Sequence, residues 1–461
     1  MFRNQNAEVI KKSRSKPETK RTAKGKGEPR ATVETIESSD EVNERELENA
    51  IILISRQHLE LPGPLLPTIS KYVLTPTVEQ RARGFFQTHS KYWLRNTDLI
   101  DRMASQTHGD EHLLASIYAV GLASFSNYVH SDKLMARARE GYVNALRLTN
   151  TALGSPSAAK KDSTLFSILI LGIYETIAGN TSRSVVAWES HVQGAVALVA
   201  FRGLEQFNSD GGQRMFFQVM SNMLIICIQR TIAMPKRIIE LRNAAEQMIQ
   251  ASRALWSLSG IMIDVTLLRA DIQAHRIVQP SAIIEVALSI DKRFEDIFSN
   301  PPPEWRYTTG HTDDRPDLVW NKTFHLFPEA WVLQTWNGMR ACRIILHEII
   351  LDQLFSSSSV PDTESDMQES SSIAICLEMQ RDILRSVPRS RPSVGRPAES
   401  RSIGGGHHAY ILWPLYLVGA MGLATERVKN WVVERLRLLS EEGGIRQAAV
   451  LAASLDRKEH L

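Results

Sequence analysis

The chain has 461 residues, 43% of them hydrophobic and 23% charged, which is long enough for one large domain or for two to three average ones. These values are ordinary for a globular protein and exclude a chain too polar to form a core. The three cysteines, Cys227, Cys342 and Cys376, are far apart and form no CxxC pair. This sparse, odd count excludes a disulfide-stapled scaffold and is typical of a reducing compartment.

The first 30 residues are strongly basic, although the net charge of the chain is only +3. They hold ten Lys or Arg against three acidic residues, and residues 31–50 hold seven acidic residues against one arginine. Such a segment buries too little apolar surface to offset its ordering entropy, so residues 1–49 are predicted to be a disordered arm, first basic and then acidic. We interpret the basic part as a nuclear import signal or a phosphate contact, with a solvated linker as the alternative; its residues are Lys11, Lys12, Arg14, Lys16, Lys20, Arg21, Lys24 and Lys26.

From Thr77 onward, apolar residues recur at steps of three and four almost everywhere. This period predicts an all-α body over residues 50–461. In the stretch 131–150, Ser131 is placed as the N-cap of an amphipathic helix. No period-two alternation and no Asn-Gly or Asp-Gly hairpin signal is found, so no strands are predicted.

Two apolar runs, residues 165–177 and 215–232, are predicted to be buried core helices. The first is broken by Tyr174 and Glu175, and the second by five polar residues: Gln218, Ser221, Asn222, Gln229 and Arg230. Neither offers the roughly 20 clean apolar residues that a membrane span needs, so no membrane contact is expected. Met1 opens a polar, charged stretch that lacks the apolar segment of a secretory signal.

Three stretches are predicted to be loops. Residues 299–322 hold a triple proline, residues 356–372 are a low-complexity polar segment, and residues 388–406 are rich in Pro, Arg, Ser and Gly. Each of the first two stretches is followed by another predicted helix with the same apolar spacing, so both are placed as loops inside one helical domain.

The segment SVVAWESHVQGAVALVAFRG, residues 184–203, carries the most specific pattern. Its apolar residues follow helical spacing, a cation stands in the last turn, and a glycine stands where a C-cap belongs. The arrangement resembles the signature helix in the C-terminal regulatory domain of fungal zinc-cluster transcription factors; the residues that carry it are Trp188, His191, Gly194, Ala195, Leu198, Arg202 and Gly203.

Further landmarks resemble this family in the same order along the chain. They are residues 2–5 and 9–12, Leu171-Gly172 with Tyr174-Glu175, Trp336-Asn337 with Arg340 and Arg343, residues 411–415 including Trp413 and Pro414, and Trp431 with Leu436. The resemblance is greatest to the subgroup known as the second fungal-specific transcription factor domain. It implies a nuclear transcription regulator that controls metabolic genes or a secondary-metabolite biosynthetic cluster, and a helical domain that senses a small-molecule inducer.

Family members carry six paired cysteines that hold two zinc ions in front of this domain. Three scattered cysteines cannot supply that site, so no cofactor is expected in this chain, and zinc enters only if a cysteine cluster lies upstream. Two interpretations therefore remain open. With such a cluster the partner is DNA; without it the chain is a non-DNA-binding modulator or scaffold that acts through a partner transcription factor or coactivator.

No enzyme signature is found in the sequence. His108 and His112 stand four residues apart but lack a third metal ligand at motif spacing, and a polar turn before a helix is the preferred explanation. The stretch 404–408, GGGHH, lacks the Lys-Ser/Thr of a phosphate loop. No GxSxG, HExxH, dinucleotide or kinase signature occurs. His191 is interpreted as a hydrogen-bonded core histidine, and no catalytic or metal residue is predicted.

Overall fold

The structure is a computed structural model that describes residues 76–89, 110–249, 253–313, 319–356, 363–388 and 409–457. All described residues belong to one unit of the chain, Pro76–Leu461. The predicted arm 1–49 with its eight basic residues therefore lies outside the described residues, as does nearly all of the predicted loop 388–406.

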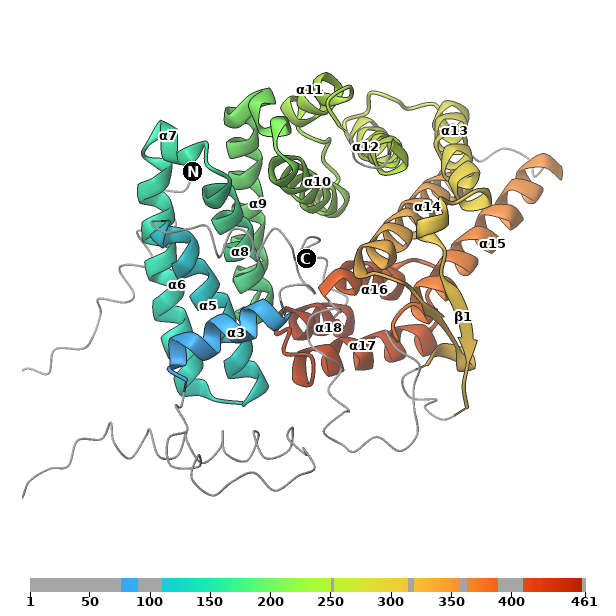
Figure 1. Cartoon of the computed structure of the whole chain (residues 1–461). Coiled ribbons are helices and arrows are strands. Elements are labelled where there is room, and N and C mark those ends of the chain that lie inside the picture. Colours follow the sequence, from blue (N-terminus) through green and yellow to red (C-terminus); the bar gives the residue numbers. More distant parts are fainter. Residues whose placement is uncertain are drawn as a thin grey trace, which may run out of the picture. The chain divides into compact units, whose positions relative to one another are not determined.

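The first half of the described unit is a set of helices around one hydrophobic core (Figure 1). These are α3 (Val78–His89), α5 (Glu111–Tyr128), α6 (Asp132–Leu153), α7 (Pro156–Ala159), α8 (Asp162–Ala178), α9 (Ser182–Arg202), α10 (Asp210–Arg230), α11 (Lys236–Ala245) and α12 (Arg253–Gln273), with the short 3-10 helix η2 (Gly203–Asn208) after α9. The two apolar runs become α8 and α10, and most of their residues are buried, as predicted for core helices.

Local signals in the sequence set the ends of two of these helices. Ser131 caps α6, because its hydroxyl accepts a hydrogen bond from the Leu134 N–H, as predicted. Gly203 ends α9 with φ of +62° and ψ of −150°, a conformation that is nearly restricted to glycine. The sequence-based placement of this C-cap is confirmed.

The second half of the unit contains six further helices and two more hydrophobic clusters. The helices are α13 (Pro280–Ser299), α14 (Ala330–Ser356), α15 (Thr363–Arg385), α16 (Leu412–Ala420), α17 (Glu426–Glu441) and α18 (Gln447–Arg457), with 3-10 turns at η3 (Pro303–Trp305), η4 (Trp320–Lys322) and η6 (Ala409–Ile411). One cluster joins α12, α13 and α14, and the other joins α14 to α18. The fold class predicted from the sequence, all-α, is confirmed for the described residues.

A short hairpin was not predicted. Strands β1 (Thr308–His311) and β2 (Thr323–Leu326) pair antiparallel, with Thr308 opposite Leu326 and His311 opposite Thr323. Part of the predicted loop 299–322 is therefore a strand. Two short strands of four residues are too brief for a recognisable period-two pattern, and the ring of Phe324, packed over Gly310, supplies the packing that holds them.

The predicted loop 356–372 is shorter than expected, because α15 already begins at Thr363. Glu364 and Asp366 lie in its first turn, where their negative charge interacts favourably with the positive end of the helix dipole. The buried hydroxyl of Ser372 bonds to His347 of α14, which holds this polar stretch in the helix. Tertiary packing thus overrides a composition typical of a loop.

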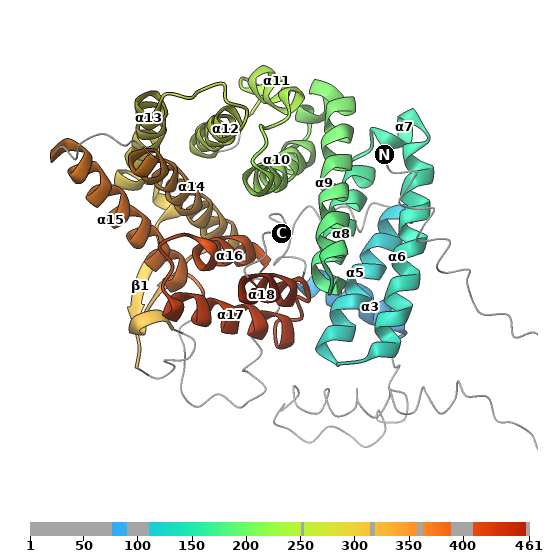
Figure 2. The same cartoon turned by 180° about the vertical axis from the view of Figure 1, so that it is seen from behind.

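The C-terminal helices return to the N-terminal ones, as the two opposite views show for α18 and α8 (Figures 1 and 2). The Arg446 N–H donates to the Ile177 carbonyl at 3.3 Å, and the Arg446 guanidinium donates to Asn127 Oδ1 at 2.9 Å. Asn127 Nδ2 in turn donates to the Gly444 carbonyl at 2.8 Å. The chain end is thereby fixed to α5 and α8.

Within the described residues, the stretch Ser182–Asn208 has the length and apolarity of a membrane span, but 56% of its most apolar window is buried inside the protein. A buried core helix can have the same length and apolarity as a membrane span, and burial of this kind is expected for such a helix.

Candidate functional site

A cavity of about 440 Å³ lies between the N-terminal helices and the C-terminal ones. Residues from α8, α9, α10, α12, α14 and α16 line it, together with Ile445 and Gln447 at the start of α18. The lining is more apolar than polar, and most of these helices also contribute polar or charged side chains. This composition is typical of small-molecule sites, which are often built between the helices of a bundle.

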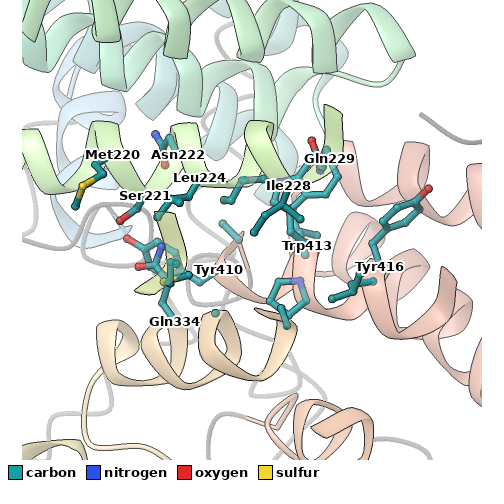
Figure 3. A pocket seen from close by; sticks show the side chains of 18 of the residues that line it. Met220, Ser221, Asn222, Leu224, Ile228, Gln229, Gln334, Tyr410, Trp413 and Tyr416 are labelled. Carbon is teal, nitrogen blue, oxygen red and sulfur yellow. The ribbon is translucent and has the colours of Figure 1, made fainter. Parts of the chain in front are cut away.

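One wall of the cavity is the polar face of α10. Gln218, Ser221, Asn222, Ile225 and Gln229 all line it, and they follow the three-to-four-residue spacing of one helical face. Figure 3 shows Ser221 and Leu224 on α10 at one side and Gln334 of α14 at the other, with Tyr410 between them. Four of the five polar residues that interrupt the apolar run 215–232 therefore face the cavity, and the fifth, Arg230, pairs with Glu189 of α9. The sequence shows this pattern, but sequence reasoning used it only against a membrane span.

Helices α10, α12 and α14 run in the same direction along the cavity. Near their N-terminal halves, Phe217 contacts Trp256 with ring centroids 5.4 Å apart. Farther along, a Cβ on Gly338 would lie 3.2 Å from the terminal methyl of Met262. At the far end, Arg269 donates to the Ile228 carbonyl. The position along each helix therefore tells which end of the cavity a residue occupies.

The charged residues of the lining gather at this far end. They are Arg269 of α12 and the carboxylates Glu348 and Asp352, one turn apart on α14. Burial raises the pKa of Glu348, and burial also raises that of Asp352. Burial lowers the pKa of Arg269, whose Nη2 donates to Thr231 Oγ1 at 3.0 Å.

Two amide groups of the lining have no hydrogen-bond partner. They are the side-chain NH2 groups of Gln229 and Gln447, whose buried Nε2 atoms have no acceptor. Gln447 as a whole is 1% exposed. A buried donor of this kind costs free energy unless an acceptor is supplied, so each is unusual in a native protein. A ligand oxygen in the cavity would satisfy such groups.

Three of the signature residues predicted from the sequence lie at this cavity. Trp188 of α9 and Trp413 of α16 both line it, with ring centroids 6.2 Å apart, and Pro414 is next to Trp413 in the first turn of α16. Gly172 of α8 faces Trp188, where a Cβ would lie 3.6 Å from the indole ring. These residues connect the two halves of the unit at the cavity wall.

The other signature residues of α9 have structural partners. His191 is 6% exposed, and its Nε2 lies 2.8 Å from the hydroxyl of Tyr142, which confirms the prediction of a hydrogen-bonded core histidine. Arg202 forms a buried ion pair with Asp162 at the start of α8. Gly194 is buried on the same helix, and Gly203 ends it.

Tyr142 also joins His191 to an acid on α8. The Tyr142 hydroxyl donates to Glu175 Oε1 at 2.5 Å. Burial raises the pKa of Glu175 to about 7 and lowers that of His191 to about 4. With the Tyr142 proton directed at Glu175, His191 must be neutral and carry its proton on Nε2. The three side chains form a buried hydrogen-bond network inside the first hydrophobic core.

A second group of signature residues lies away from the cavity. The Trp336 indole N–H donates to the Trp305 carbonyl at 2.7 Å, and Asn337 Nδ2 donates to Ser386 Oγ at 2.8 Å. Arg340 is fully buried and donates to the Tyr307 hydroxyl at 2.9 Å. These contacts fix α14 to α15 and to the segment before the hairpin, which is a structural role.

One cluster on α13, α14 and α15 has the residue types of a catalytic triad. His347 lies 3.1 Å from Asp291 Oδ2 through Nε2 and 3.1 Å from Ser372 Oγ through Nδ1. Arg343 binds both carboxylate oxygens of Asp291, at 2.6 and 2.7 Å, and these bonds, with burial opposing them, leave the Asp291 pKa lowered to about 2. Ser372 is fully buried and His347 is 1% exposed, so a substrate cannot reach them. The cluster holds three helices together.

The remaining sequence predictions concern metal ions and thiols. His112 is buried and its Nε2 lies 3.2 Å from Thr164 Oγ1, while His108 lies outside the described residues. No group of three metal-binding side chains occurs among the residues that the structure describes. The three cysteines are buried in α10, α14 and α15, and burial raises the pKa of each to about 12, so they are neutral thiols.

A cavity between helices can accommodate a small molecule, but many classes of helical protein share this arrangement. Comparison with known families is more specific: residues 86–247 match the model of the fungal specific transcription factor domain, and no zinc cluster is detected. Residues 86–247 are therefore similar to this domain, whose family consists of transcription regulators and not of enzymes. The match runs from α3 to just beyond α11, within the first core. No curated protein and no solved structure matches the chain.

Proposed function

We propose that this fungal transcription regulator responds to a small molecule bound in the central cavity, and that it acts in the nucleus on metabolic or secondary-metabolite biosynthetic genes. The family match supports regulation of transcription and implies a nuclear role. The observation that carries the proposed response is the cavity itself, which is lined mainly by apolar side chains and contains unpartnered amide donors. The target genes and the inducer rest on the resemblance described above.

The position of the cavity explains how a ligand would act. Its walls combine helices of the matched domain, α8 to α10, with α14 and α16 from the remainder of the unit. A ligand that contacts both sets stabilises the arrangement in which they are packed together. It shifts the population toward that arrangement by as much as its affinities for the two states differ.

A second candidate function is a modulator without DNA contact of its own. It is favoured by the burial of Cys227, Cys342 and Cys376 in three separate helices, where they cannot form a zinc cluster. Such a chain would reach chromatin through a partner transcription factor or coactivator. The basic arm would contribute phosphate contacts that weaken with salt and carry no sequence information.

The regulatory function is tested by fusing the full chain to an unrelated DNA-binding domain in a fungal reporter strain. We expect reporter output to rise or fall several-fold relative to the DNA-binding domain alone. An unchanged reporter together with exclusion of the protein from the nucleus would overturn the proposal.

The two candidates are separated by mapping the chromatin sites of the unfused chain and then binding the purified chain to those fragments. Sequence-specific binding by the purified chain supports direct DNA recognition. The modulator is supported if the purified chain alone does not bind the fragments that it occupies in cells. In that case, adding a zinc-cluster protein that crosslinks to the chain in cells should restore binding.

A further inference from the structure

We propose that the ligand of the central cavity is an elongated, mostly apolar amine, with its cation at the Glu348 end and with oxygen acceptors for the unpartnered amide N–H groups of Gln229 and Gln447. This inference rests on the proposed function, because it specifies the chemistry of the small molecule that the same cavity takes. It follows from the order in which charged, polar and apolar side chains occur along the cavity.

The middle of the cavity selects apolar ligands. Its walls there are aliphatic and aromatic side chains from α10, α14 and α16, among them Leu224, Ile228, Ile345, Trp413 and Leu417. Gly338 of α14 also lines the cavity, and the terminal methyl of Met262 packs close to it, 3.2 Å from where a Cβ would stand. Burial of hydrocarbon against such walls is the main source of affinity for an apolar ligand.

The cavity is elongated along the helices. The polar residues of its α10 wall extend from Gln218 to Gln229, which at 1.5 Å per residue is about 16 Å of helix. Gln334 and Thr335 of α14 lie near the start of this path, and Glu348 and Asp352 lie near its end. A ligand that spans the cavity therefore meets neutral polar groups at one end and charged groups at the other.

The charge at the far end favours a cation. Two carboxylates, Glu348 and Asp352, face a single cation, Arg269. Arg269 already donates through both terminal nitrogens, to the Ile228 carbonyl and to Thr231 Oγ1, which directs its guanidinium toward the end of α10. Glu348 accepts the Gly422 N–H at 2.9 Å through Oε1, which leaves its second carboxylate oxygen as a further acceptor site.

Two further observations agree with this polarity. Burial raises the pKa of Glu348 because desolvation of the carboxylate outweighs the Gly422 hydrogen bond and the nearby Arg269, and a ligand ammonium would stabilise the ionised form further. Gln229 is next to Ile228, the residue that Arg269 contacts, so its unpartnered N–H lies at the same end. An amine with a neighbouring hydroxyl or carbonyl oxygen satisfies both groups.

The test uses the purified full chain and three probes that differ only in the head group: decylamine, decanol and decanoate. Binding is measured by calorimetry and by the thermal shift at neutral pH. We expect decylamine to bind at least about tenfold more tightly than the other two, because a charge-assisted hydrogen bond forms with it alone.

Three variants assign the selectivity to residues. Glu348→Gln keeps an acceptor for Gly422 and should reduce decylamine affinity about tenfold while leaving decanol unchanged. Asp352→Asn removes the other carboxylate at this end of the cavity and serves in its place if the first variant does not fold. Gly338→Leu adds a bulky side chain to the cavity wall beside Met262, where a Cβ alone already meets the Met262 methyl at 3.2 Å, and should weaken all three probes. Glu295→Gln, an exposed change on α13 outside the lining, is the matched control.

The outcomes separate this inference from the function on which it rests. Equal binding of the three probes, or tightest binding of decanoate, would overturn the amine assignment while the cavity remains a ligand site. If no probe binds and Gly338→Leu has no effect on reporter output, the ligand response itself fails. Loss of decylamine selectivity in Glu348→Gln, with the control unchanged, supports the proposal.

Discussion

The network of Tyr142, Glu175 and His191 makes stability depend on pH in a direction that can be calculated. Burial raises the pKa of Glu175 from 4.5 to about 7. Between these two values the folded protein holds a proton that the unfolded chain has lost, so stability falls as pH rises through this window. Each unit of pKa shift corresponds to about 1.4 kcal/mol, so the penalty above pH 7 approaches ~3 kcal/mol.

Replacement of Glu175 by glutamine removes the titrating group while keeping an oxygen that accepts from the Tyr142 hydroxyl. We expect Glu175→Gln to be more stable than the parent at pH 8 by about 1–3 kcal/mol, since the loss of a hydrogen bond to a charged acceptor offsets part of the gain. Near pH 5 both proteins carry a neutral group at this position, and the difference should nearly vanish. Urea unfolding followed by tryptophan fluorescence at pH 5 to 8 measures both values.

His191 contributes with the opposite sign. Burial lowers its pKa from 6.5 to about 4, so its contribution to stability is lost as pH falls through this range. It is present in the parent and the variant alike and largely cancels in their difference. The control is Glu205→Gln, because Lys160 lowers the pKa of this exposed carboxyl and the stability that it contributes is lost on acidification. A Glu175→Gln effect that is independent of pH, or that grows as pH falls, would refute the burial argument.

Three further predictions concern separate parts of the chain. Arg343→Met strands the buried carboxylate of Asp291 and should lower the free energy of unfolding by about 3–5 kcal/mol in urea, whereas replacing both residues with apolar ones should restore much of it; an equal loss in both variants would count against the ion-pair explanation. Gly203→Ala forces a side chain onto a backbone with φ of +62° and should cost about 1–3 kcal/mol by the same assay, and a neutral result would mean that α9 ends differently. Alanine at Lys11, Lys12, Arg14 and Lys16 should reduce nuclear accumulation of a fluorescent fusion, and unchanged accumulation would favour the solvated linker.

Sequence reasoning succeeded where a property depends on residues close together in the chain. Helical spacing identified α9, and local chemistry placed the Ser131 cap and the Gly203 terminus. The same spacing predicted that α8 and α10 are core helices. Each of these features is decided within one or two helical turns, so its signal is present in a short segment.

The hairpin and the start of α15 were missed for the opposite reason. Strand β1 is held by pairing with β2 and by Phe324, and neither is visible in the composition of residues 299–322. The polar residues from Thr363 onward are helical because Ser372 reaches a buried partner on another helix. A composition typical of a loop does not reveal a partner elsewhere in the chain.

The sequence alone determined that this is a helical chain with a fungal transcription factor domain, because family resemblance and periodicity are both recorded along the chain. Tertiary structure decided where the polar residues of the core are placed. Tyr142 and Glu175 are 33 residues apart, and Arg343 and Asp291 are 52 apart, yet each pair is in direct contact. The cavity likewise exists because α10, α14 and α16 pack with space between them. Packing across such distances is set by the shapes of whole helices, so it cannot be obtained from local spacing.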